Sequence, residues 1–244
     1  DKSVLSCDTL KNDKNNKFSL LLHQLIVRDY INSYTPYRGL LLYHGLGAGK
    51  TCGSIGIAEG MKSEKKIFVM APASLIMNYK MELRKCGDPI YKTNQFWEFI
   101  KTEGNEHQIK ALSEVLHLTT QYIRKNNGAW LVNVNKKSNY DELNNDERTQ
   151  INNQIEKMIN RKYQFIAYNG MNKSKLQALE LQANSKGKNN PFDDSVIIID
   201  EAHNFVSRIV NKLKKKKSIS MKLYEYLMSA ENCKIVFLTG TPII

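Results

Sequence analysis

The 244-residue sequence predicts an α/β fold, with a parallel sheet that carries helices on both faces. Three apolar runs favour this fold, at residues 39–43, 66–71 and 196–199. The first two are followed by helix-like segments, and the third ends in a pair of acids. Continuous apolar runs that alternate with helices are typical of parallel strands, because crossover helices cover both faces of such a sheet.

The chain begins with a polar stretch, residues 1–17, which we expect to be a tail or linker. Residues 18–33 have apolar side chains at helical spacing and predict a helix. Within it, Gln24 carries a carboxamide, whose paired donor and acceptor match the N6 and N7 edge of adenine. An exposed helix glutamine is the simpler alternative, but its position just before the first strand favours a nucleotide contact.

The run Gly39–Tyr43 ends in a glycine-rich turn that closes with Gly49-Lys50-Thr51. A helix over residues 50–61 follows, so the turn and the helix start would offer N–H groups to phosphates. We expect Lys50 to reach the terminal phosphates and the Thr51 hydroxyl to bind Mg²⁺. A P-loop normally has glycine where His44 stands, and a turn without a ligand is the alternative. The predicted nucleotide contacts are Gln24, Gly45, Leu46, Gly47, Ala48, Gly49, Lys50 and Thr51.

The next core elements are a strand at Lys66–Ala71 and a helix over 72–86, which Ser74 is expected to cap and Gly87 to end. Residues 88–160 are expected to be an insertion or elaboration. They predict one amphipathic helix at 106–125, a strand near 129–134 and a helix through 151–159. The aromatic cluster at 96–100 could stack on bases, although a core role is favoured.

A second chemical site follows the strand Val196–Ile199, where the chain continues as Asp200-Glu201-Ala202-His203. The carboxyl ends of strands form the edge at which α/β sheets bind ligands. Asp200 is placed to hold Mg²⁺, and Glu201 to orient and deprotonate a water. His203 could sense the γ-phosphate. An acidic turn without function is the alternative.

Two further strands are predicted, at Tyr163–Tyr168 and Lys234–Leu238. The second ends in Thr239-Gly240-Thr241-Pro242, a turn with two hydroxyls beside the acidic site. These hydroxyls could couple the γ-phosphate region to a bound strand, whereas an ordinary Gly-Pro turn is the plainer interpretation.

The formal net charge of +12 indicates a polyanionic partner such as nucleic acid, although a lysine-rich proteome would also produce it. Lys212 and Lys214 to Lys217 form a basic run that could contact phosphates, but a solvated helix end is slightly favoured. Four cysteines (Cys7, Cys52, Cys86 and Cys233) lack zinc spacing and are interpreted as reduced thiols of an intracellular protein. No run reaches membrane-spanning length, so no membrane partner is expected.

The order of these motifs resembles that of superfamily 2 helicases. Gln24 and the segments 47–51, 71–75, 200–203 and 239–242 are similar to motifs Q, I, Ia, II and III. Segments 72–79 and 165–169 resemble the Swi2/Snf2-like branch. Segments 41–51 and 200–205 look most like helicases of nucleocytoplasmic large DNA viruses, including the poxvirus nucleoside triphosphate phosphohydrolase and early transcription factor.

The resemblance implies a RecA-like P-loop NTPase domain over residues 18–244, with ATP and Mg²⁺ as cofactors. A second RecA-like domain, with an arginine that stabilises the transferred phosphoryl group, is expected elsewhere in a longer polypeptide. This chain alone should therefore hydrolyse ATP weakly. Nucleic acid, DNA or RNA, would be contacted at Pro72, Ser74 and Asn169, with Thr239 and Thr241 as coupling residues.

The implied function is an ATP-driven helicase or translocase in viral transcription or replication, in the virion or the host cytoplasm. One alternative is a translocase of the Snf2 or restriction type that does not unwind. Another is a nucleotide-dependent recruitment module. Intact Lys50, Asp200 and Glu201 argue against the latter.

Overall fold

The computed structural model describes residues 21–43, 45, 49–185, 187–212 and 218–241, so the predicted tail lies outside the described residues. A five-stranded sheet has the order β1-β7-β6-β2-β5 and is parallel throughout. Its strands are β1 (Gly39–Tyr43), β2 (Lys66–Ala71), β5 (Tyr163–Ala167), β6 (Ser195–Ile199) and β7 (Lys234–Thr239). The predicted parallel sheet is confirmed.

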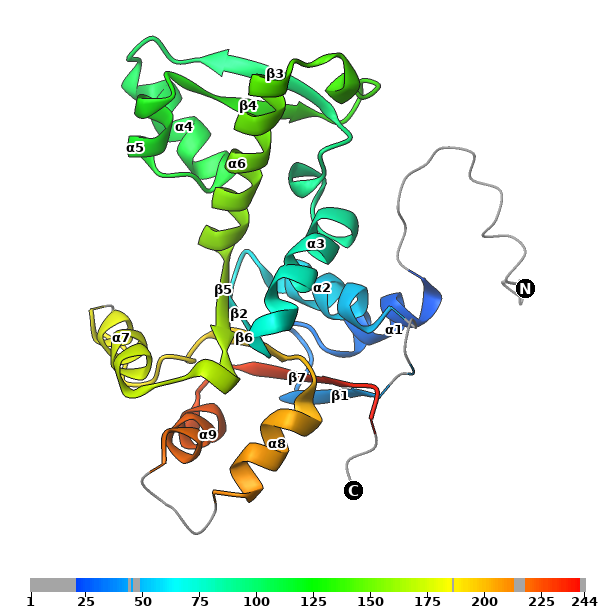
Figure 1. Cartoon of the computed structure of the whole chain (residues 1–244), viewed down its shortest axis with the longest axis vertical. Coiled ribbons are helices and arrows are strands. Elements are labelled where there is room, and N and C mark those ends of the chain that lie inside the picture. Colours follow the sequence, from blue (N-terminus) through cyan, green and yellow to red (C-terminus); the bar gives the residue numbers. More distant parts are fainter. Residues whose placement is uncertain (1–20, 44, 46–48, 186, 213–217, 242–244) are drawn as a thin grey trace.

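Helices cover both faces of this sheet, as Figure 1 shows. One face carries α1 (Leu22–Tyr30), α2 (Lys50–Met61) and α3 (Ile76–Cys86), and the other carries α7 (Lys173–Asn184), α8 (Ala202–Val210) and α9 (Ile219–Ser229). Each face has its own cluster of buried apolar side chains. Every residue of β6 is buried, because this strand lies inside the sheet and is covered from both sides.

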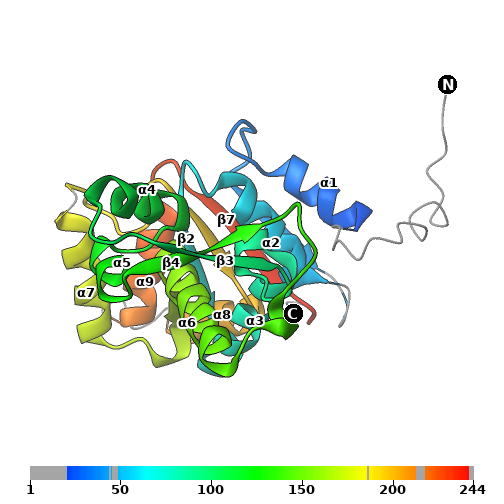
Figure 2. The same cartoon turned by 90° about the horizontal axis from the view of Figure 1, so that it is seen from above.

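Residues 96–162 form a block beside the face that carries α2 and α3 (Figures 1 and 2). It contains an antiparallel pair, β3 (Phe96–Lys101) and β4 (Gly128–Asn133), together with α4 (Glu106–Leu116), α5 (Thr120–Lys125) and α6 (Asn145–Lys162). The single helix expected at 106–125 is wrong. His117 adopts φ 51° after α4, and the Thr119 side chain accepts a hydrogen bond from the N–H of Tyr122 to start α5.

Short 3₁₀ turns precede or follow several elements: η2 (Ala73–Leu75), η3 (Pro89–Tyr91), η4 (Tyr140–Glu142) and η5 (Tyr168–Gly170). Because η2 occupies the start of the predicted helix, Ser74 does not cap α3. Gly87 does end α3, and its N–H donates to the Leu83 carbonyl.

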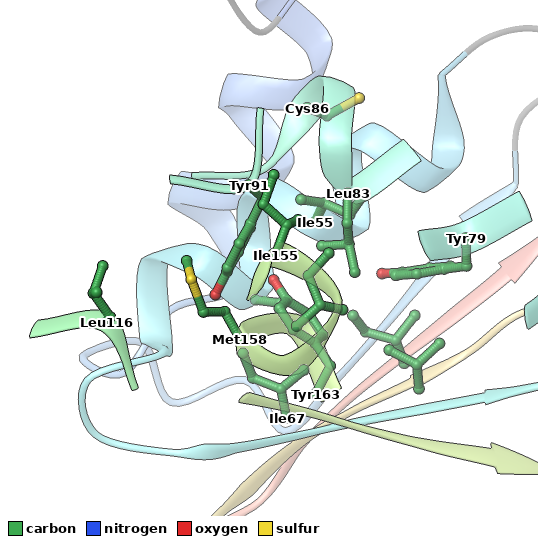
Figure 3. Close-up of a cluster of buried hydrophobic side chains, with 14 of the residues drawn as sticks. Ile55, Ile67, Tyr79, Leu83, Cys86, Tyr91, Leu116, Ile155, Met158 and Tyr163 are labelled. Atoms are coloured by element: carbon green, nitrogen blue, oxygen red, sulfur yellow. The ribbon is translucent and has the colours of Figure 1, made fainter. Parts of the chain in front are cut away.

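The block at 96–162 shares one apolar cluster with the central sheet. Figure 3 shows Tyr91, Ile155, Met158 and Tyr163 lying beside side chains of α2, α3 and β2. The aromatic residues Trp97 and Trp130 are 2% and 6% exposed, so they belong to the core as favoured. The block is therefore held to the central sheet by continuous packing.

Cys52 and Cys86 form a disulfide, with their Cα atoms 5.4 Å apart. The expectation of reduced thiols is therefore wrong for this pair. The two residues are 34 positions apart, and only the packing of α2 against α3 brings them together. Cys233 is a buried free thiol, and Cys7 lies outside the described residues. Among the described helices, none combines the length and apolar character that a membrane crossing requires.

Candidate nucleotide site

Three neighbouring strands bring the predicted nucleotide residues to one edge of the sheet. β7 lies between β1 and β6, and all three run in the same direction. β1 leads to the turn before Lys50, β6 leads to Asp200, and β7 ends at Thr239. The sheet topology thus gathers residues that are separated by nearly 190 positions in the sequence.

Gly49 directly precedes α2 and has φ 73°, a conformation that favours glycine. A Cβ atom at this position would lie 2.4 Å from Nε2 of Gln24, so a side chain here would displace the Gln24 amide. Lys50 opens the helix, and its Nζ donates to the Gly45 carbonyl at 3.3 Å. His44, Leu46, Gly47 and Ala48 lie outside the described residues.

Gln24 is buried, with 3% of its surface exposed, so the exposed-glutamine alternative is wrong. Its Nε2 donates to the Gly49 carbonyl at 3.0 Å, and its Oε1 accepts from the Leu21 N–H at 2.9 Å. Both hydrogen-bonding groups of the carboxamide are thus engaged within the chain. Gln24 ties α1 to the end of the glycine-rich turn.

Asp200 follows β6 and is half-buried. Burial is the main cause that raises the pKa of its carboxyl, and the negative charge of Glu201 adds to the increase. The Glu201 N–H, which donates to Oδ1 at 3.0 Å, and the positive charge of Lys50 oppose it. The ammonium of Lys50 and the carboxylate of Asp200 therefore act within electrostatic range of each other.

Glu201 has φ 48°, which costs a non-glycine residue about 1–2 kcal/mol. The buried Tyr168 holds this turn: its hydroxyl lies 3.2 Å from the Asp200 carbonyl and 3.1 Å from the Glu201 carbonyl. The Tyr168 ring packs edge-on against Phe205. Sequence reasoning missed this positioning role, because no local pattern links the end of β5 to the acidic turn.

His203 joins the acidic turn to the end of β7. Its Nδ1 lies 3.0 Å from Oγ1 of Thr239 and 3.3 Å from Oε2 of Glu201. The Thr239 hydroxyl donates to the Thr241 carbonyl at 3.0 Å and accepts from the Thr241 N–H at 3.1 Å. The Thr239 hydroxyl therefore lies between the imidazole of His203 and the backbone of Thr241, and the tautomer of His203 sets which of the two donates in the bond they share.

The oxygen donors present here suit Mg²⁺. The Thr51 hydroxyl and the Asp200 carboxylate are hard oxygen ligands, which magnesium prefers. Thr51 stands in the first turn of α2, next to Lys50. The donor chemistry therefore fits the expected ion.

Two of the predicted nucleic-acid residues line a hollow at this edge. A pocket of about 280 Å³ is lined by Pro72, Tyr168, Asn169, Asn204 and Arg208. Asn169 Oδ1 accepts from the Ala73 N–H at 3.0 Å, which links η5 to η2. Arg208 adds a cation that the sequence interpretation did not single out. Ser74 is exposed and outside this lining.

The chain matches the profile of the type III restriction enzyme res subunit family over residues 17–244. The chain belongs to this family. Two viral relatives support the assignment to superfamily 2 helicases of viral type, and with the family match they confirm the resemblance drawn from the motifs.

R563 of Acanthamoeba polyphaga mimivirus, described as a candidate ATP-dependent RNA helicase, is 30% identical over 230 residues. The alignment covers 93% of this chain and 30% of R563. A termination factor NPH-I homolog of African swine fever virus is 24% identical over 205 residues, covering 84% of this chain and 20% of that protein. This res-family chain thus spans less than a third of the length of these relatives.

Among solved structures, the SWI2/SNF2 ATPase core of Sulfolobus solfataricus in complex with dsDNA aligns with 93% of this chain and 33% of that chain. The TM-score is 0.44 and the sequence identity is 16%.

Proposed function

We propose that this chain is the ATP-binding domain of a nucleic-acid-dependent ATPase that couples ATP hydrolysis to movement on DNA or RNA. The observation that carries the proposal is the gathering of Lys50, Asp200, Glu201, His203 and Thr239 at the carboxyl edge of one sheet. The set combines a phosphate-binding cation, a metal-binding carboxylate, a base and a hydrogen-bonded link to a neighbouring strand. The family match supports a nucleotide-hydrolysing role.

In the proposed mechanism, the start of α2 and the Lys50 ammonium bind the ATP phosphates. Thr51 and Asp200 would hold Mg²⁺, which neutralises charge on the phosphates when bound. Glu201 orients a water and takes its proton at a carboxylate oxygen. The raised pKa of Asp200 makes its ionisation responsive to the cations around it, and Lys50 already favours the charged form.

Coupling between nucleotide and nucleic acid would use two chains of polar contacts. One runs from Glu201 through His203 to Thr239 and Thr241. The other runs from the carbonyls of the acidic turn through Tyr168 to the adjacent Asn169 and on to Ala73. A shift of the acidic turn would therefore reach the coupling residues Thr239 and Thr241 and also the segments around Asn169 and Ala73 that are proposed to contact nucleic acid.

Adenine recognition by Gln24 is part of the proposal and requires an exchange of partners. Its Nε2 now donates to Gly49 and its Oε1 accepts from Leu21. A bound adenine would replace one or both of these bonds. The binding of the base would thereby alter the contact between α1 and the glycine-rich turn.

The whole protein is proposed to need a second RecA-like domain that supplies an arginine to the transferred phosphoryl group. Such an arginine contributes roughly 10³–10⁵-fold to the rate in related phosphoryl-transfer systems. This chain alone is therefore proposed to bind ATP-Mg²⁺ weakly and to turn it over slowly.

The test is ATP hydrolysis by the full-length protein with single- and double-stranded DNA and RNA. At least one nucleic acid should stimulate hydrolysis. The Glu201→Gln variant should retain Mg²⁺-dependent ATP binding and lose about 10²–10⁴-fold in turnover. Hydrolysis that no nucleic acid stimulates, or that Glu201→Gln leaves intact, would overturn the proposal.

A translocase that moves without unwinding is a second candidate, which the match to a restriction-enzyme family favours. Strand displacement from a duplex separates the two. A helicase releases the displaced strand, whereas a translocase of this kind displaces a third strand from a triplex and leaves the duplex intact.

A further inference from the structure

The edge of the sheet opposite the nucleotide site is strongly basic. Lys66 begins β2, Lys162 directly precedes β5, and Asp194 directly precedes β6. These are the amino ends of parallel strands, whereas the nucleotide residues follow the carboxyl ends. Strands of five residues separate the two edges by roughly 16 Å, at about 3.3 Å per residue.

A hollow of about 460 Å³ opens at this amino edge. Its lining has six cations and two acids, drawn from the ends of α2 and α6, the start of β2 and the loop before β6. The cations are Lys62, Lys65, Lys66, Arg161, Lys162 and Lys188, and the acids are Glu64 and Asp194.

A second hollow, of about 770 Å³, lies between α5 and α6 and shares Arg161 with the first. It adds Lys125 and Lys157, the aromatic ring of Tyr122 and several side-chain amides. Its one acid, Glu156, forms ion pairs with Lys80 at 2.6 Å and Arg84 at 3.6 Å. We name these two hollows, which share Arg161, the amino-edge groove.

Several of the groove's cations are fixed by contacts inside the chain. Lys62 pairs with Glu59 and Asp88, and Lys188 pairs with Asp194. Lys65 donates to the carbonyl and side-chain oxygens of Asn232 at 2.7 and 2.9 Å. These contacts hold the walls of the groove in place.

By contrast, Lys125, Lys157 and Arg161 are exposed. Lys157 and Arg161 stand one helical turn apart on α6 and so present their charges on the same face. These three side chains are available to an incoming anion.

Two titratable groups in the groove experience repulsion from its cations. Burial is the main cause that lowers the pKa of Lys162, and the charge of Lys62 lowers it further. The pKa of His117 is likewise lowered by burial and then by Lys162, Lys62 and Arg161. Added negative charge would relieve this mutual repulsion.

We propose that the amino-edge groove binds the phosphate backbone of a nucleic acid, at a site separate from the track proposed at the carboxyl edge. The inference rests on the proposed function for the choice of polyanion. Lysine, arginine, amide and tyrosine side chains are the groups that contact phosphates and sugars without reading sequence. Eight cations line the two hollows, and the exposed three, Lys125, Lys157 and Arg161, come from two helices, an arrangement that suits a backbone of several phosphates.

The test is fluorescence anisotropy of labelled duplex DNA and single-stranded RNA, measured without nucleotide over 50–200 mM salt. The variant combines Lys125→Glu, Lys157→Glu and Arg161→Glu, at exposed sites where folding is expected to tolerate change. We expect at least a tenfold loss of affinity and a salt slope reduced by about 2–3, since each phosphate contact contributes about 0.7–0.9. The thermal unfolding temperature and the affinity for ATP should stay close to those of the unmodified chain.

The matched control changes three exposed lysines elsewhere in the same block, Lys101→Glu, Lys110→Glu and Lys137→Glu. Net charge falls equally, so an equal loss of affinity in the control would show a bulk charge effect and overturn the proposal. So would an unchanged salt slope in the groove variant, or no binding by the unmodified chain. The proposed function is judged separately, by stimulated hydrolysis in the full-length protein.

Discussion

His203 and Thr239 are joined by a hydrogen bond of 3.0 Å between Nδ1 and Oγ1. The bond connects the first turn of α8 to the end of β7, and Thr239 is 1% exposed. Because the Thr239 hydroxyl also exchanges hydrogen bonds with the backbone of Thr241, one side chain ties three segments together. This is the link through which the state of the nucleotide would reach the Thr239–Thr241 turn.

The Thr239→Val variant removes this link with little change of volume. It should lower the free energy of unfolding by about 1–3 kcal/mol, because buried partners lose a hydrogen bond. Nucleic-acid stimulation of hydrolysis in the full-length protein should fall more than ATP affinity does. Thr239→Ser keeps the hydroxyl and should therefore retain the stimulation of hydrolysis by nucleic acid. An equal loss of stimulation in both variants would show that the hydroxyl is not the coupling group.

The Asp200→Asn variant should lose Mg²⁺-dependent nucleotide binding and still be at least as stable as the unmodified chain at pH 7. Burial raises the folded-state pKa of Asp200, so folding favours its neutral form. Below the unfolded-state pKa of about 3.9 the carboxyl is neutral in both states and costs nothing. As pH rises through the raised folded-state pKa, the charged form appears and the unfolding free energy falls.

Chemical denaturation of both chains from pH 4 to pH 8 measures this effect. The stability difference should grow in favour of Asp200→Asn as pH rises and vanish near pH 4. A variant that is less stable at pH 7 and gains toward pH 4 would give the opposite sign and contradict the account.

The Gln24→Ala variant should destabilise the chain by about 1–3 kcal/mol, because the buried Gln24 amide and its hydrogen bond to the Gly49 carbonyl are lost. Urea denaturation measures the change. Gln182→Ala, at an exposed glutamine of α7, should remain within about 0.5 kcal/mol. If Gln24 also reads adenine, Gln24→Ala should lose preference for ATP over GTP; an unchanged preference would leave Gln24 with its structural role alone.

Reduction of the Cys52–Cys86 disulfide should lower the unfolding free energy by roughly 3–4 kcal/mol, from the loop-closure estimate for a separation of 34 residues. Urea denaturation with and without reductant measures it. The Cys86→Ser variant should not respond to reductant, whereas Cys233→Ser should respond like the unmodified chain, since Cys233 is a free thiol. An unfolding free energy that does not change when reductant is added would contradict the presence of the disulfide.

The core of the fold was predictable because its signals are local. The expected bounds of α2 (50–61) and β2 (66–71) agree with the structure, since a glycine-lysine pair and a lysine mark where each begins. The pattern at 106–125 wrongly predicted one helix, because apolar residues keep helical spacing across the break between α4 and α5. Leu116 and Leu118 are both buried, and His117 between them turns the chain through a left-handed conformation.

In the site, residue identities were predictable and their contacts were not. Asp200 and Glu201 could be identified because they directly follow an apolar strand. The positive φ of Glu201 and its contact with the Tyr168 hydroxyl could not, because they depend on how β5 and β6 are placed in the sheet. The same holds for Gln24, whose carboxamide is buried against Gly49. The disulfide likewise depends on the packing of two helices. Gly47 and Lys214 to Lys217 lie outside the described residues, so their assigned roles stay predictions.

The most direct test of the nucleotide site is the binding of a fluorescent ATP analogue to this chain and to its Lys50→Ala variant, with and without Mg²⁺. Circular dichroism would first establish that both are folded. The account predicts Mg²⁺-dependent binding by the unmodified chain and its loss in the variant. Equal binding by the two folded chains, or binding indifferent to Mg²⁺, would contradict the assignment of the Lys50 and Asp200 edge as the phosphate and metal site.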